Sequence, residues 1–147
     1  MPVKKGKTLL LHNKFECSYE EAWRVQHLRS LKSAYGKSPF FDEYFDVFQE
    51  FYSNEFNLLI EWNRQSLRLL VYLLQIDSNK LVFTDRECQE FLNIHPKQKE
   101  MDSMFYAQEY MQNFSFKHGF KQNLSAVDLL FNEGPYASEI LKKSVRT

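Results

Sequence analysis

Three basic side chains lie close together in the sequence, in a pattern that could bind phosphate. Arg29 and Lys32 are three residues apart in a predicted helix, so they share one face. Lys37 follows that helix and lies beside the predicted start of the next one, where free backbone N–H groups attract anions. Together these residues could hold a phosphate or pyrophosphate, and Tyr35 could stack on a ring attached to it. A solvated basic helix face gives the same pattern without any ligand.

Two histidines are candidates for acid–base chemistry, because imidazole titrates near neutral pH. His27 falls four residues after Trp23 on the same predicted helix face, where a histidine bonded to the backbone is the simpler interpretation. His118 precedes Gly119 at a predicted turn, where a functional side chain can be exposed.

The sequence contains no local metal-binding motif. None of the 4 histidines shows the HxxxH or HxxE spacing of a metal site. Cys17 and Cys88 form no CxxC pair, and two lone thiols fit a reducing cytosol, with a single disulfide as the alternative. We therefore predict no metal and no cofactor.

Polar residues surround a short apolar segment near the C-terminus. Asn123, Asp128 and Asn132 lie on or beside a predicted helix that begins at Ser125. Their side chains either satisfy backbone groups at the helix ends or reach into a cleft. The first interpretation is the simpler one for Asp128, whose place in the first turn suits a capping residue.

The composition indicates one folded domain that spans residues 1–147. Apolar residues make up 44% of the chain and aromatic residues 16%, which suffices for a core. The 19 basic and 19 acidic residues cancel, which disfavours nucleic acid as a partner. The most apolar stretch, residues 56–76, carries Glu61, Arg64 and Arg68, so it predicts a core helix and no membrane span.

The elements that would carry these side chains are mostly helices. The predicted fold class is mainly α, or α+β with a minor sheet, with about five helices and a short N-terminal β-hairpin. Ser18 and Glu21 predict a capping box that starts the first helix, and Gly36 predicts its end in a left-handed conformation. Pro39 predicts the start of the second helix, and the third covers about residues 56–76.

The remaining predicted elements are short. They are the hairpin (2–11), a strand (80–84), a brief helix (84–93), a second strand (114–120) and two C-terminal helices (125–133 and 135–143). Only two or three residues precede the hairpin turn, so its first strand could pair few backbone groups.

Several of these stretches together resemble the WbqC-like protein family of bacteria. The matching residues are 2–7 (PVKKGK), Trp23 with 27–35 (HLRSLKSAY), 37–41 (KSPFF), 118–120 (HGF) and 123–135 (NLSAVDLLFNEGP). Family members usually begin with a further segment rich in aromatic residues and proline. The resemblance therefore implies that residues 1–147 form the C-terminal two-thirds of such a domain.

Members of this family are associated with the synthesis of O-antigen and related surface polysaccharides. The resemblance implies a cytoplasmic protein of that process, in which the chain would be a transferase that modifies a nucleotide-activated sugar. Arg29, Lys32 and Lys37 would neutralise its phosphates, and His27 or His118 would act as acid or base. The residues expected to position the substrate are Trp23, Tyr35, Asn123, Asp128 and Asn132.

The alternative is a non-catalytic interaction module or an oligomerising helical domain. Phe41, Tyr44, Phe45, Phe48, Phe51 and Tyr52 fall at helical spacing and predict an aromatic stripe. If the stripe were partly exposed, it could bind a partner or a second copy of the chain as a homodimer.

Overall fold

The computed structural model describes residues 1–4, 14–84 and 105–145, and this part of the chain is mainly helical, as predicted. The α-helices are α1 (Trp23–Tyr35), α2 (Phe41–Ser53), α3 (Leu59–Leu73), α4 (Ser115–His118), α5 (Ala126–Glu133) and α6 (Ala137–Lys143). Two 3-10 turns, η2 (Ser78–Lys80) and η4 (Gly134–Tyr136), lie between them. Within the described residues, no helix has the length and apolar character needed to cross a membrane.

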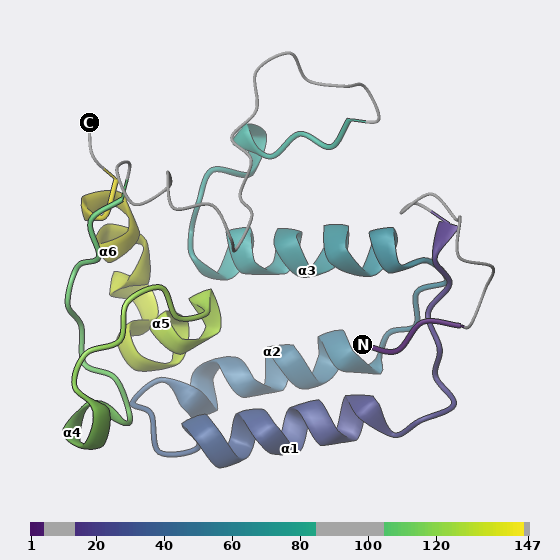
Figure 1. Ribbon diagram of the computed structural model, residues 1–147. Coiled ribbons are helices and arrows are strands. Elements are labelled where there is room, and N and C mark those ends of the chain that lie inside the picture. Colours follow the sequence, from purple (N-terminus) through teal and green to yellow (C-terminus); the bar gives the residue numbers. More distant parts are fainter. Residues whose placement is uncertain (5–13, 85–104, 146–147) are drawn as a thin grey trace.

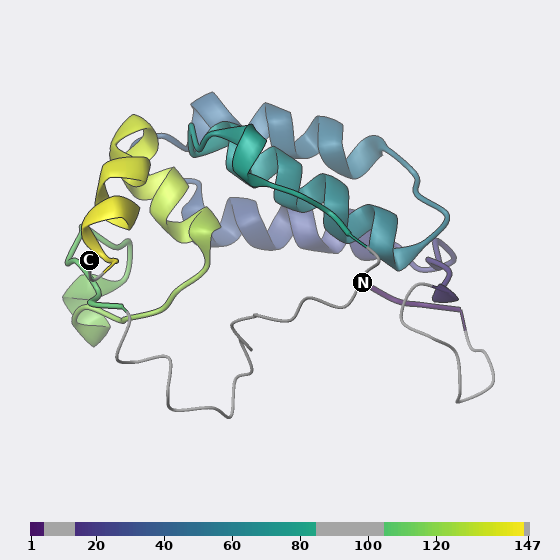
Figure 2. The same cartoon turned by 90° about the horizontal axis from the view of Figure 1, so that it is seen from above.

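The three long helices form an antiparallel bundle, and the C-terminal helices close one of its ends. Figure 1 shows α1, α2 and α3 running along one direction, each reversing the sense of the one before it. α5 contacts both α2 and α3 and leads through η4 into α6. The view from above (Figure 2) places α5 and α6 at the same end of the bundle. This end is built from segments that are far apart in the sequence.

The larger core lies where α2, α3 and α5 meet. Leu130 and Phe131 of α5 are fully buried there, against Phe41 and Phe48 of α2. The rest of the predicted aromatic stripe is only partly exposed and packs on one of the two core clusters. The stripe therefore packs largely inside the bundle, and its use in binding a partner or a second copy stays a prediction.

A second core cluster lies at the opposite end, around Trp23 and Trp62, whose ring centroids are 5.2 Å apart. The predicted capping box at Ser18 is wrong, because α1 begins at Trp23 and has no side-chain cap. Ser18 instead uses its backbone: its N–H donates to the Pro2 carbonyl (3.1 Å), and its carbonyl accepts from the Trp23 indole (2.8 Å). The bond to Pro2 satisfies the Ser18 N–H, which the Glu21 side chain would have bonded in the predicted box.

The minor sheet is reduced to single bridges in the described residues. Val3 pairs with Cys17, Glu16 with Leu58, and Phe105 with Val145, all antiparallel. The predicted hairpin is not confirmed, and residues 5–13, which hold most of it, lie outside the described residues. The predicted helix at 84–93 likewise falls almost wholly outside them.

Two predicted strands are wrong. Residues 81–84 are irregular, and Phe83 lies under the guanidinium groups of Arg64 and Arg68, 5.5 and 5.2 Å from its ring centroid. Residues 115–118 form the helical turn α4. An alternating pattern forms a strand only where a neighbour pairs its backbone, and here the His118 N–H bonds locally to the Phe114 carbonyl.

Local signals at the other helix ends match the structure better. α3 is shorter than predicted at both ends, and its Glu61 carboxylate accepts from the Leu58 N–H (3.2 Å). α1 ends before Gly36 as expected, but Gly36 is right-handed (φ −61°), which corrects the left-handed prediction. α5 has the predicted Ser125 cap, which accepts from the Val127 N–H (3.3 Å).

Candidate functional site

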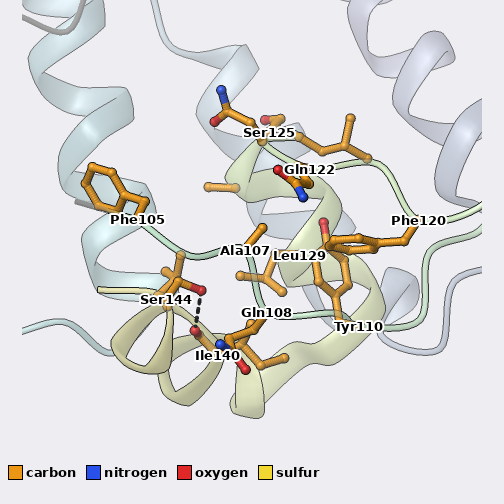
Figure 3. A pocket seen from close by; sticks show the side chains of 14 residues that line it. Phe105, Ala107, Gln108, Tyr110, Phe120, Gln122, Ser125, Leu129, Ile140 and Ser144 are labelled. Carbon is orange, nitrogen blue, oxygen red and sulfur yellow. Dashed lines mark hydrogen bonds between the residues drawn. The ribbon is translucent and has the colours of Figure 1, made fainter. Parts of the chain in front are cut away.

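A cleft of about 380 Å³ opens at the C-terminal end of the molecule. Its walls come from residues 105–110, the 120–125 loop, α5 and α6. Figure 3 shows Ala107 and Leu129 in its middle, with Gln122 and Ser125 on one side and Ile140 on the other. The cleft therefore combines a polar loop with an apolar helical wall, as small-molecule sites commonly do.

The 122–125 loop presents polar groups that the fold does not use. Within the described part of the chain, the side chains of Gln122 and Asn123 form no hydrogen bond. Asn123 has a positive φ of 58°, a conformation that asparagine tolerates better than most residues. The Ser125 hydroxyl accepts from a backbone N–H and keeps its own proton free to donate.

The loop is held in place by a buried glutamine. Gln112 donates from Nε2 to the Lys121 carbonyl (2.8 Å), and its Oε1 accepts from the Lys121 N–H (2.9 Å). This double hydrogen bond fixes the backbone directly before Gln122. Next to it, the rings of Tyr110 and Phe120 meet edge to face with centroids 5.7 Å apart. They form a rigid aromatic corner of the cleft.

Asp128 is buried beneath this corner. Its Oδ2 accepts a hydrogen bond from the Tyr110 hydroxyl (2.7 Å), and its backbone carbonyl accepts from Asn132 Nδ2 (2.8 Å). Burial, followed by the charge of the Asp128 carboxylate and a hydrogen bond to it, raises the pKa of Tyr35 to about 12. Burial and the hydrogen bond to Asp128 also raise the pKa of Tyr110. Both tyrosines therefore stay protonated around the carboxylate, as the low dielectric favours.

We expect the folded protein to lose stability as the pH rises from 10 towards 12. The pKa of Tyr35 is raised from 10.0 to about 12, so its contribution is complete below pH 10 and disappears as the pH passes the folded value. Urea unfolding at pH 9, 10.5 and 11.5, with phenolate absorbance at 295 nm, would measure this loss. Tyr35→Phe should flatten the alkaline slope. A slope unchanged by Tyr35→Phe would contradict the assignment.

Trp23 is a core residue, and Tyr35 is partly buried against the main core. The Tyr35 ring packs on Phe131 with centroids 5.3 Å apart. Trp23 is only 3% exposed, and its indole N–H is already bonded to Ser18. Asn132 is also buried, within α5. Of the five residues expected to position a substrate, only Asn123 lines the cleft directly, and Asp128 reaches it through Tyr110.

The predicted phosphate-binding residues lie on the outer surface near the same end. Arg29, Lys32 and Lys37 are exposed, and none of them is ion-paired within the described residues. The first turn of α2 already carries Asp42 and Glu43, which neutralise the dipole of that helix. The lysines, rather than the helix end, are therefore the source of any attraction for an anion.

A single side chain ties this basic surface to the segment before α4. Asn113 Nδ2 donates to the Ala34 carbonyl (2.9 Å) and to the Ser38 hydroxyl (2.8 Å). α4, which follows directly, carries Lys117 and His118, and Figure 1 shows it beside the end of α1. The fold thus brings His118 to the same end of the molecule as the cleft, Lys32 and Lys37.

His27 lies elsewhere, beside the second core cluster. Its ring meets Trp23 edge to face (centroids 5.3 Å apart), and Nδ1 lies 3.4 Å from the Tyr52 hydroxyl. His27 is exposed as a whole, but partial burial against these neighbours, followed by the positive charge of the amino terminus, lowers the pKa of its imidazole. His27 is eight residues before Tyr35, so the two lie about 12 Å apart along the helix axis. The structure therefore separates the two candidate histidines.

Several cleft residues carry no sequence signal of their own. No recognisable motif includes Tyr110, Gln108 or Gln122. The polar residues 121–123 after Gly119 are typical of an exposed loop, and they were the one signal in this region. In the described part of the chain, no group of three His, Cys, Asp or Glu side chains could hold a metal ion.

Comparison with known proteins places the chain in a family. The model of the WbqC-like protein family matches residues 1–94, and the chain belongs to this family. The match includes α1, α2 and α3 with the basic surface, whereas the cleft residues follow it. No curated protein and no solved structure shows a significant match.

Proposed function

We propose that this chain acts in the cytoplasm, in bacterial surface polysaccharide (O-antigen) biosynthesis, as a transferase that binds a nucleotide-activated sugar. One observation carries the proposal: a cleft whose Gln122 and Asn123 side chains form no hydrogen bond within residues 1–4, 14–84 and 105–145 lies at the end of the molecule that carries Lys32 and Lys37, which are not ion-paired within the same residues. Sugars need hydrogen-bonding groups and aromatic faces, and nucleotides need cations for their phosphates.

The proposal divides the ligand between two surfaces. The sugar occupies the cleft, where Gln122 and Asn123 bond its hydroxyls and the Tyr110 and Phe120 rings contact its C–H face. The phosphates lie outside the cleft, within reach of long basic side chains. Arg29, Lys32 and Lys37 supply the charge, as the sequence predicted.

His118 is the proposed acid or base in this arrangement. It is exposed at the end of α4, two residues before Phe120 of the cleft wall. Histidine is the side chain most often used as a general acid or base. His27 is less suitable. It lies in the N-terminal half of α1, where its ring faces Trp23 of the same helix and Tyr52 of α2.

Calorimetric titration with UDP- and GDP-linked sugars tests the proposal. Asn123→Gly keeps the positive φ while it removes the side chain, and we expect it to weaken binding about tenfold or more, the effect of one or two lost hydrogen bonds. Lys32→Ala should weaken binding several-fold and reduce its salt dependence. Lys80→Ala, on exposed η2, is the matched control and should change nothing.

Two results would count against the proposal. Absence of binding to every nucleotide sugar tested would reject it as a whole. Binding that Arg29→Ala and Lys32→Ala leave unchanged would remove the phosphate assignment alone.

A further inference from the structure

The cleft is uncharged. Its described lining contains aromatic, aliphatic, amide and hydroxyl side chains, and no Asp, Glu, Lys, Arg or His. A phosphate inside it would lose its water without meeting a counter-charge, which is strongly unfavourable. The part of a ligand that enters the cleft must therefore be neutral.

The two sides of the cleft differ in chemistry. Gln122 and Asn123 each offer an N–H donor and a carbonyl acceptor, and Ser125 offers an additional donor. Facing them, Leu129, Ile140 and Leu141 offer apolar surface. Two polar side chains lie beside them (Figure 3): the Ser144 hydroxyl is bonded to the Ile140 carbonyl (2.8 Å), and Gln108 Nε2 donates to the Lys143 carbonyl (3.4 Å). A ligand that fits both sides has paired donor and acceptor groups close to an apolar substituent.

We infer that the cleft recognises a neutral sugar ring that carries an acetamido or similar acylamino group. The amide of this substituent pairs with the loop amides in both directions. Its methyl group contacts the leucine and isoleucine side chains of the cleft, including Leu124 of the loop next to those amides. A plain hydroxyl would leave that apolar wall facing water or a polar group. This inference rests on the proposed function and names the class of sugar that it uses.

Replacement of Leu124 tests the contact between the cleft and the methyl group of the ligand. It belongs to the cleft lining and is 46% exposed, so a polar replacement should leave the fold intact. Leu67 on α3 is similarly exposed (42%) and lies outside the cleft, which makes Leu67→Ser a matched control.

Titration of the whole chain with methyl N-acetyl-β-glucosaminide and methyl β-glucoside, followed by the corresponding UDP-sugars, tests the inference. We expect the acetamido ligand of each pair to bind about fourfold more tightly, the effect of one buried methyl group. Binding of the uncharged glycoside should be unaffected by salt. Leu124→Ser should reduce the preference, and Leu67→Ser should preserve it.

The outcomes separate this inference from the proposed function. If both UDP-sugars bind equally well, or if Leu124→Ser leaves the preference unchanged, the acylamino assignment is overturned and nucleotide-sugar binding stands. If no sugar or nucleotide sugar binds, both proposals fail together.

Discussion

Replacement of Gly134 by alanine is expected to destabilise the fold by about 3 to 5 kcal/mol, the sum of backbone strain and overpacking. Gly134 joins α5 to η4 with a positive φ of 52°, which L side chains rarely adopt. A Cβ there would lie 2.5 Å from two atoms of the Phe40 ring. The Phe40 N–H is bonded to the Phe131 carbonyl (3.1 Å), so the backbone that carries the ring is held in place. Urea unfolding of both proteins measures the difference.

Gly119→Ala is the matched control for this prediction. Gly119 also has a positive φ, 65°, but a Cβ there would meet nothing within 4 Å. Its replacement should therefore cost the strain alone, about 1 to 3 kcal/mol. If the two variants were equally stable, the proposed clash with Phe40 would be disproved. Phe40→Leu should recover part of the stability lost in Gly134→Ala, since it shrinks the obstructing ring.

Replacement of Phe131 by alanine is expected to cost about 3 to 5 kcal/mol through a cavity in the main core. The side chain is fully buried, and its ring centroid lies 5.2 Å from that of Phe41 and 5.4 Å from that of Phe48. These contacts join α5 to the bundle. The neighbouring helices therefore cannot fill the cavity without moving α5, which also lines the cleft. Thermal and urea unfolding would both report the loss.

Phe116→Ala controls for the removal of an aromatic ring. Phe116 lies on α4 and is 78% exposed, so its replacement should stay within about 0.5 kcal/mol of the parent. Equal stability of the Phe116 and Phe131 variants would contradict the assigned core. Leucine at position 131 keeps most of the apolar volume and should cost less than alanine.

α5 links the stability of the fold to the candidate site. Phe131 faces the bundle core, whereas Leu129 lines the cleft and Asp128 holds the Tyr110 hydroxyl. Side chains of this one short helix therefore contribute to the core, to the wall of the cleft and to the position of Tyr110. Variants that loosen α5 should weaken ligand binding together with stability, whereas Asn123→Gly should weaken binding alone.

Features that depend on neighbouring residues could be predicted from the sequence. Ser125 caps α5 and Gly134 ends it, because capping and left-handed turns use atoms only a few residues away. The predicted start of α2 at Pro39 is two residues too early, because the helix begins at Phe41 and Pro39 lies in the turn before it. The exposed Arg29, Lys32 and Lys37 were also predictable, since long charged side chains are rarely buried without partners.

Features that depend on distant partners were missed or wrong. Ser18 looked like a helix cap, but its backbone bonds to Pro2 and to the Trp23 indole before any helix starts. Residues 114–120 alternated like a strand, yet within the described residues no neighbouring strand pairs with them. The aromatic stripe was correctly predicted as helical, but whether it faced solvent or core was a question of packing.

The sequence by itself determined a helical class, membership of the WbqC-like family and a basic surface on α1. Only the tertiary structure decided that the buried Asp128 accepts a hydrogen bond from Tyr110, 18 residues earlier in the sequence. It also decided that Asn113 donates a hydrogen bond to Ala34, from which it is separated by 79 residues. The cleft also exists only because residues 105–110, the 120–125 loop, α5 and α6 meet in space. Burial and enclosure arise when several elements pack together, and no single segment carries that information.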